Sequence, residues 1–149
     1  MFRGRFEHSV DEKGRLAIPS KFREALDSES RIPVFFITNF DKCLVAYPEK
    51  EWKELEQKIS ELPQFDPKVI SFQRYYISGA AECQIDKAGR ILLPPNLRRF
   101  ANLEKECMVS GAVSKFEIWS RESWQEEFDT ISCNFQDVSQ SLSQFNVGI

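Results

Sequence analysis

One nine-residue pattern occurs twice in this chain, and the repetition constrains the fold more than any other feature. The first copy spans residues 11–19 (DEKGRLAIP) and the second spans 86–94 (DKAGRILLP), 75 residues further along the chain. Aspartate, glycine, arginine and proline recur at the same places in both copies, and Arg23 has its counterpart in Arg98. The chain is therefore a tandem repeat of one structural unit.

The similarity between the two halves continues beyond this pattern. The segment LVAY at 44–47, followed by Trp52, corresponds to FEIW at 116–119, followed by Trp124. We therefore expect a first repeat at 5–52, with its helix extending to about 62, a linking helix at 63–78 and a second repeat at 79–124. A unit of about 45 residues seldom buries enough apolar surface to fold alone. The two repeats should share one hydrophobic core.

Each copy of the pattern is typical of a tight turn between two strands. Residues 6–10 alternate between apolar and polar side chains, which predicts a strand with one buried face. The first aspartate of the turn at 11–14 can accept backbone N–H bonds, and Gly14 can adopt a positive φ. A return strand follows at 15–18, and Pro19 ends it and can open a short helix over 21–26. The second copy predicts a strand at 81–85, a turn at 86–89, a strand at 90–93 and a helix at 96–101.

The rest of the chain completes an α+β pattern. We expect strands at 33–38, at 43–47 and near Met108 and Glu117. Apolar residues at helical spacing predict helices at 48–62, at 66–76 and after Ser120. Trp52, Trp119 and Trp124 lie on such apolar stripes, so we expect them in the core or at a subunit contact rather than as base-stacking platforms. The Ser-, Gln- and Asn-rich composition near the end predicts a flexible tail at 133–149.

Charge is distributed unevenly along the chain. The formal net charge is −3. Residues 1–26 carry a net charge of +2, whereas residues 121–149 carry −4. The chain is therefore polarised, with its basic end first, and that end is the one better suited to contact with a polyanion such as nucleic acid.

The sequence offers little for catalysis or for a membrane. His8 is the only histidine, and the four cysteines lie far apart without a C-x-x-C pair, so we expect small core residues rather than a zinc site or a disulfide set. No phosphate loop or nucleophile elbow is present. We therefore expect no catalytic residue, no metal, no cofactor and no small-molecule substrate. No apolar run is long enough to cross a bilayer, so we expect a cytoplasmic protein without membrane contact.

The arginine that follows the turn glycine is the strongest functional signal. In a single copy, D-x-x-G-R could be only a well-built turn in which the aspartate pairs with the arginine. Both copies, however, retain the arginine, as Arg15 and Arg90. The planar guanidinium suits bidentate contact with phosphate or with a guanine edge, and a two-stranded β-ribbon fits into the major groove.

These motifs resemble a known family. The segments MFRG at 1–4, D-x-K-G-R-L-A-I-P at 11–19, Phe22 with Arg23, SGA at 78–80, D-x-x-G-R-I at 86–91, Pro94 and EIW at 117–119 are similar to the MraZ family of transcriptional regulators, in the AbrB-like (SpoVT-AbrB) superfamily. The similarity covers roughly residues 1–125. It implies tandem AbrB-like repeats that form a swapped-hairpin β-barrel with flanking helices.

The resemblance also implies a function. It implies a nucleoid-associated regulator that binds double-stranded DNA upstream of the bacterial division and cell-wall gene cluster, and that assembles into a ring-like homo-oligomer reading short direct repeats. Arg15 is then expected to contact bases or phosphate, and Lys13, Arg3 and Arg5 to contact phosphate, with Asp11 orienting Arg15. Asp86 and Arg90 are the corresponding pair of the second copy. Ala88 replaces Lys13 there, so the first turn is expected to carry more of the DNA contact.

Two other interpretations of the same fold remain open at this stage. An AbrB-like chain can serve as a protein-interaction module whose partner binds a separate arm, or as a structural ring subunit without direct DNA readout. The only candidate arm for such a partner is the short segment 134–149. The structural ring subunit predicts binding that does not depend on Arg15.

Overall fold

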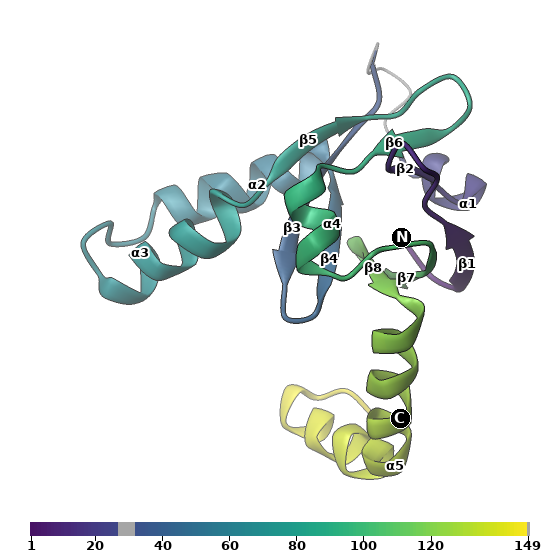
Figure 1. The fold of residues 1–149 in the computed structure, drawn as a ribbon. Helices are drawn as coiled ribbons and strands as arrows, with labels where there is room; N and C mark the ends of the chain where they lie inside the picture. The colour runs from purple at the N-terminus through teal and green to yellow at the C-terminus, as the bar shows by residue number, and fades with distance from the viewer. Residues whose placement is uncertain (27–31, 149) are drawn as a thin grey trace.

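The computed structural model describes residues 1–26 and 32–148 as a mixed α+β fold. Six strands form one sheet in the order β1-β7-β8-β4-β3-β5, and two further strands, β2 and β6, form a separate pair (Figure 1). All pairings are antiparallel. The strands are β1 (Arg5–Ser9), β2 (Arg15–Ala17), β3 (Val34–Phe40), β4 (Cys43–Pro48), β5 (Ala81–Gln84), β6 (Arg90–Leu92), β7 (Glu106–Ala112) and β8 (Lys115–Ser120).

The two repeats are intertwined rather than side by side. β1 of the first repeat pairs with β7 of the second, and β5 of the second pairs with β3 of the first. Because β5 corresponds to β1 and β7 to β3, the sheet order reads the same from both ends when the repeats are exchanged. This arrangement is the swapped-hairpin architecture that the family resemblance implies.

The residues alone predict a hairpin in which the strand after the turn pairs with the strand before it, and this pairing is largely absent. β2 meets its own β1 through a single bridge, Val10 to Leu16, and pairs along its whole length with β6 of the other repeat. The equivalent bridge, Ile85 to Ile91, joins β6 to β5. The β2–β6 pair therefore closes the gap between the two edge strands of the six-stranded sheet and completes a barrel.

One core fills this barrel with residues of both repeats. Phe2, Phe22 and Phe35 of the first half pack with Phe116 of the second, with ring centroids 5.0 to 6.5 Å apart. All four rings are buried. A single repeat would leave many of these ring contacts unmade, which explains why both are needed for one core.

Helices follow the strands in both repeats. The two short helices α1 (Ser20–Arg23) and α4 (Pro95–Phe100) come after the prolines that end β2 and β6, and each buries one residue, Phe22 or Leu97. The expected helix over 21–26 thus ends earlier, at Arg23. α2 (Glu49–Ser60) and α3 (Pro67–Phe72), with the π-helix Gln73–Ile77, form an arm that extends from the barrel (Figure 1).

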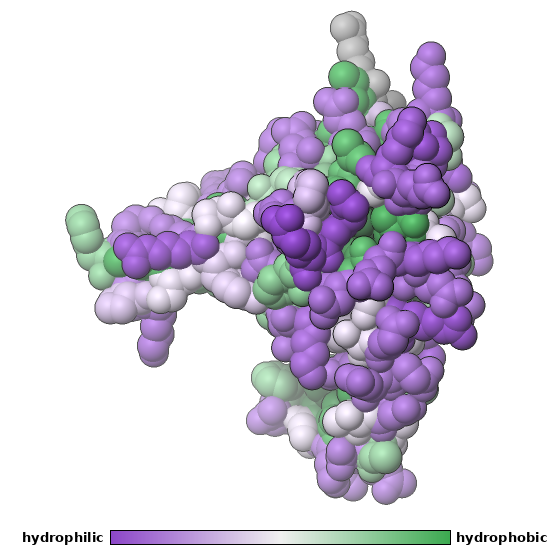
Figure 2. All heavy atoms as spheres, in the orientation of Figure 1, coloured by the Kyte–Doolittle hydropathy of each residue, from purple (hydrophilic) through white to green (hydrophobic). Residues whose placement is uncertain are grey.

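A second apolar cluster anchors the arm to the outer face of the sheet. It contains Trp52, Tyr76 and Trp119, with Trp124 packed against it, so all three tryptophans lie in or against the protein interior. The far end of the arm remains exposed: Phe65 is 95% exposed, and the tip is apolar in Figure 2. The apolar residues at helical spacing on α2 therefore pack on the barrel only in the first part of the helix.

The last helix, α5 (Arg121–Ser141), extends away from the barrel and is followed by a 3-10 turn, Leu142–Phe145 (Figure 1). Residues 134–141 are thus helical, and the flexible tail predicted over 133–149 is wrong for this segment. The difference has a physical reason: Ile131, Phe135 and Val138 continue a helical spacing of four and three residues that the surrounding Ser, Gln and Asn obscure. Cys133 lies exposed on this helix, while the other three cysteines are buried as expected.

A helix that spans a bilayer needs about 20 mostly apolar residues. None of the helices within residues 1–26 and 32–148 is long and apolar enough to cross a membrane.

Candidate nucleic-acid interface

The β2–β6 pair, called here the β2–β6 ribbon, presents one buried face and one outward face. Leu16 and Ile91 point into the barrel and are completely buried. Residues on either side of them point outward because side chains alternate along a strand. In the antiparallel register Arg15 lies opposite Leu92, and Ala17 lies opposite Arg90. The ribbon therefore carries one arginine from each repeat on the same outward face.

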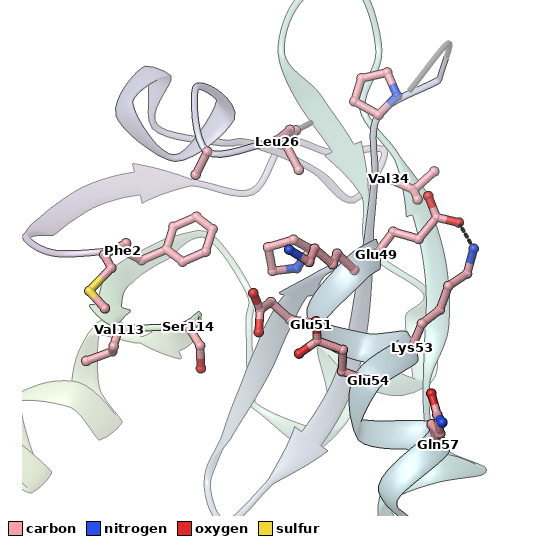
Figure 3. A pocket seen from close by; sticks show the side chains of 15 residues that line it. Phe2, Leu26, Val34, Glu49, Glu51, Lys53, Glu54, Gln57, Val113 and Ser114 are labelled. Atoms are coloured by element: carbon pink, nitrogen blue, oxygen red, sulfur yellow. Dashed lines mark hydrogen bonds and ion pairs between the residues drawn. The ribbon is translucent and has the colours of Figure 1, made fainter. Parts of the chain in front are cut away.

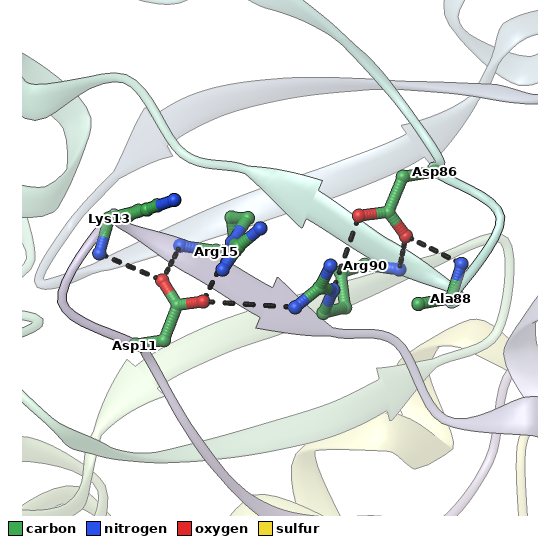
Figure 4. Close-up of polar contacts among 6 residues, drawn as sticks. All are labelled: Asp11, Lys13, Arg15, Asp86, Ala88 and Arg90. Atoms are coloured by element: carbon green, nitrogen blue, oxygen red, sulfur yellow. Dashed lines mark hydrogen bonds and ion pairs between the residues drawn. The ribbon is translucent and has the colours of Figure 1, made fainter.

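Asp11 holds the first turn and its arginine. One carboxylate oxygen accepts the backbone N–H groups of Lys13 and Arg15, both at 2.9 Å. The other oxygen accepts the Nε–H of Arg15 at 2.7 Å (Figure 4). The carboxylate engages the Nε side of the guanidinium, which leaves the edge with the two amino groups for a partner.

Asp86 repeats this arrangement in the second turn. Its carboxylate accepts the backbone N–H groups of Ala88 and Arg90 at 2.9 Å, and the Nε–H of Arg90 at 3.2 Å. The two turns are also adjacent in space, because an amino group of Arg90 lies 3.9 Å from a carboxylate oxygen of Asp11 (Figure 4). Both copies of the motif thus form one continuous surface.

Hydrogen bonding keeps both aspartates ionised. The pKa of Asp11 lies below its ordinary value of 3.8, chiefly because the carboxylate accepts the backbone N–H of Arg15. The pKa of Asp86 is lowered in the same way by the backbone N–H of Arg90. Each aspartate therefore orients its arginine as a charged acceptor at neutral pH.

Two further arginines were not among the predicted site residues. A Cβ atom added to Gly14 would lie 2.7 Å from the guanidinium carbon of Arg98, and one added to Gly89 would lie 2.5 Å from a guanidinium nitrogen of Arg23. Each arginine therefore lies against the turn of the opposite repeat. Glycine is favoured at both positions because φ is +85° at Gly14 and +76° at Gly89, which residues with a Cβ atom rarely adopt. Their corresponding positions in the two repeats were the sequence signal that could have identified Arg23 and Arg98 as site residues.

Backbone hydrogen bonds reinforce this exchange between the repeats. The N–H of Ile18 donates to the carbonyl of Gly89, and the N–H of Leu93 donates to the carbonyl of Gly14, both at 2.9 Å. Arg98 also donates its Nε–H to the carbonyl of Leu93 at 3.1 Å. The turns, the ribbon and the two added arginines are thus held in fixed relative positions.

The structure brings only some of the predicted site residues together. Lys13 lies exposed at the first turn beside Arg15, and Ala88 holds the equivalent place in the second turn. Arg5 lies elsewhere: its guanidinium sits over the rings of Phe128 and Trp124 of α5, 4.6 and 5.7 Å from their centroids. Arg3 precedes it, with its backbone against Gly111. Contact of Arg3 and Arg5 with DNA stays a prediction, and DNA binding by the ribbon does not depend on it.

A groove that no ribbon residue lines has a different character. It measures about 1020 Å³ and is lined by apolar residues such as Phe2 and Leu26 and by the carboxylates of Glu49, Glu51 and Glu54 (Figure 3). Lys53 pairs with Glu49 at 2.6 Å within this lining. The carboxylates would repel a polyanion. Among the described residues no group of three or more His, Cys, Asp or Glu side chains could hold a metal ion.

The fold and the ribbon together define a class: a tandem-repeat, swapped-hairpin barrel of AbrB-like type, with a paired Asp–Arg turn from each repeat on one surface. Comparison with known proteins gives the family. The family model described as "MraZ protein, putative antitoxin-like" matches the chain twice, at residues 1–75 and 76–146. A protein of Desulforamulus reducens named Transcriptional regulator MraZ is 43% identical over 143 residues, which cover 95% of this chain and 97% of that protein. The chain belongs to the MraZ family.

The hydrogen bonds of the two turns generate a prediction about pH. In a carbon-13 NMR titration of the side-chain carboxyls, Asp11 and Asp86 should titrate below 3.8. Because the folded pKa is depressed, the stabilisation of each turn is fully present above the ordinary pKa and is lost as the pH falls through the lower folded value.

A variant separates the two sources of this depression. Arg15→Ala removes the guanidinium and keeps the backbone N–H, so it should raise the pKa of Asp11 toward 3.8 without reaching it, and should leave Asp86 nearly unchanged. Titration of wild-type Asp11 at or above 3.8 would contradict the hydrogen-bonded turn.

Proposed function

We propose that this chain is a transcriptional regulator that binds double-stranded DNA with the outward face of the β2–β6 ribbon. The observation that carries the proposal is the presence of Arg15 and Arg90 on one exposed two-stranded ribbon, each oriented by its own aspartate. A two-stranded ribbon is narrow enough for the major groove, where an arginine fork matches the O6 and N7 acceptors of guanine. The family membership and the name of the Desulforamulus relative support a regulatory role.

The distribution of charge supports this face over others. Lys13, Arg23 and Arg98 surround the two ribbon arginines, and the aspartates of the two turns are already paired with arginine. The exposed acidic residues of α2 and α5 lie on elements that extend away from the barrel (Figure 1). A DNA duplex on the ribbon therefore meets cations, while the acidic helices face solvent or other subunits.

We further propose that the protein acts as a ring-like homo-oligomer on short direct repeats at the nucleoid, upstream of the division and cell-wall gene cluster and close to its own gene. One ribbon offers few phosphate contacts, and the whole chain carries a net charge of −3. Several subunits bound to successive repeats would raise the overall affinity, because each further contact is made at a high effective concentration. Multimer formation therefore compensates for a weak single site.

An apolar stripe on α5 is the surface proposed for self-association. Ile131, Phe135 and Val138 share one side of this helix and are 42 to 50% exposed. Most of the helix's acidic residues, including Glu126, Asp129 and Asp137, fall on the other side by their spacing. Two such helices can pair through their stripes and keep their charges in water.

A protein-interaction role without DNA readout is the second candidate function. The apolar tip of the arm, with Leu62 and Phe65 exposed, favours it because such a tip suits a protein partner rather than DNA. The antitoxin-like description of the family model is consistent with such a partner. This alternative predicts that the ribbon arginines can be removed without consequence for binding.

The first test compares wild-type protein with Arg15→Ala on a DNA fragment from upstream of the protein's own gene. Fluorescence anisotropy should show about five- to 150-fold weaker binding for Arg15→Ala, since a bidentate contact with a base contributes about 1 to 3 kcal/mol. Wild-type affinity should fall with salt by about 0.9 log unit per log unit of salt for each phosphate neutralised.

The control for that test removes an equal charge elsewhere. Arg74 is an exposed arginine on the π-helix of the arm, so Arg74→Ala should bind like wild type. Equal affinity of wild type and Arg15→Ala, or no salt dependence, would favour the protein-interaction alternative.

The second test concerns the α5 stripe. Size-exclusion chromatography with light scattering should report a multimer for wild type and a smaller species for the double variant Phe135→Ser with Val138→Ser. Gln140→Ser, on the polar side of the same helix, is the matched control and should keep the wild-type mass. An unchanged mass for the double variant would show that subunits meet through another surface.

A further inference from the structure

The outward face of the ribbon is built with two-fold pseudosymmetry, yet its residues are not symmetric. The repeat relationship exchanges Arg15 with Arg90 and Ala17 with Leu92. In the observed register each arginine lies opposite one of the other two: Arg15 opposite Leu92, and Arg90 opposite Ala17. The same backbone thus presents an arginine beside a large apolar side chain on one side, and an arginine beside a methyl group on the other.

Leu92 is a large apolar residue on the outward face. It is 59% exposed, whereas its chain neighbours Ile91 and Leu93 are completely buried. It borders a hollow of about 470 Å³ whose lining also includes Pro94 and Pro95, the cations Lys13 and Arg98 and the carboxylate of Glu82. The exposed leucine and the prolines offer apolar contact, and two cations against one carboxylate leave the lining net positive. Such a lining suits a ligand that combines an apolar group with negative charge.

The geometry of the ribbon relates Leu92 to the arginine opposite it. Directly opposed residues of an antiparallel pair have Cβ atoms about 5 Å apart, whereas base pairs are stacked about 3.4 Å apart. A ribbon placed with Arg15 on a base edge therefore brings Leu92 to the same base pair or to a neighbouring one. The thymine C5-methyl is the apolar group on the major-groove edge of DNA.

We propose that Leu92 contacts a thymine methyl next to the base read by Arg15, and that the difference between Leu92 and Ala17 fixes the orientation of each subunit on its site. This inference rests on the proposed function and adds a specificity-determining residue to it.

A symmetric ribbon would bind a site equally well in both directions. With Leu92 on one side only, one direction makes the methyl contact, and Lys13, which corresponds to Ala88 in the other turn, adds to the same asymmetry. Subunits that bind in one direction require repeats that point the same way.

The test changes the DNA by methyl groups alone. Fluorescence anisotropy is measured on the fragment from upstream of the gene and on the same fragment synthesised with deoxyuridine in place of thymidine. Wild-type protein should bind the deoxyuridine fragment about fourfold more weakly for each thymine methyl that Leu92 touches, since one buried methyl group contributes about 0.8 kcal/mol. Leu92→Ala should bind both fragments equally, with about the wild-type affinity for the deoxyuridine fragment.

Three controls assign the effect to Leu92. Leu92→Met keeps an apolar chain at this position and should retain the discrimination between the two fragments. Val113→Ala removes an exposed apolar side chain between β7 and β8, away from the ribbon, and should behave as wild type. Circular dichroism melting curves of all variants establish that they fold alike. If Leu92→Ala does not fold, Leu92→Gln takes its place, because it keeps the length of the side chain and removes its apolar end; it should likewise bind both fragments equally.

The outcomes separate this inference from the proposed function. Wild-type binding that is equal on both fragments overturns the role of Leu92 and leaves DNA binding by Arg15 intact. If deoxyuridine weakens the binding of wild type and of Leu92→Ala by the same factor, the role of Leu92 is likewise overturned and DNA binding by Arg15 stands. Absence of wild-type binding to both fragments overturns the proposed function and the inference with it. A smaller assembly for Leu92→Ala with discrimination retained assigns Leu92 to a subunit contact and overturns the methyl contact.

Discussion

The pairing of β2 with β6 is the contact on which the rest of the structure depends. These three-residue strands come from different repeats, and their pairing closes the barrel between the two edge strands β1 and β5. The same pairing buries Leu16 and Ile91 and places Arg15 and Arg90 on one outward face. Folding and the construction of the candidate site are thus one event. A chain whose repeats failed to exchange strands would lose its closed core and its recognition surface together.

The two repeats are alike where they hold the fold and differ where they face outward. The turn aspartates, the turn glycines and the arginines that lie against those glycines are identical in both copies, because each occupies a position with strict geometric demands. The exposed positions differ: Lys13 corresponds to Ala88, and Ala17 corresponds to Leu92. A symmetric scaffold therefore carries an asymmetric surface. The proposed direct-repeat binding has a physical basis in that difference.

The sequence was most informative about local structure. The turns, their aspartate–arginine pairs and the positive φ of Gly14 follow from residues within five positions of one another, and the structure confirms them. The contacts of Arg5 and Arg98 could not be predicted, because each depends on which distant segment packs against it. The residues alone predicted that β2 pairs with the strand before its turn, which is largely wrong, since three-residue strands carry too little pattern to select a partner. Only the family resemblance implied the exchange. The helical end of α5 was not predicted for a different reason: its polar composition masks the spacing of its apolar residues.

One strand from each repeat is proposed to form a single DNA-reading surface, and a structure of the protein bound to its upstream DNA would show whether it does. In that complex we expect the β2–β6 ribbon of a subunit in one major groove, with the guanidinium groups of Arg15 and Arg90 both within hydrogen-bond distance of bases or phosphates. A complex in which the DNA lies against another face, with the ribbon exposed to solvent or covered by a neighbouring subunit, would contradict it.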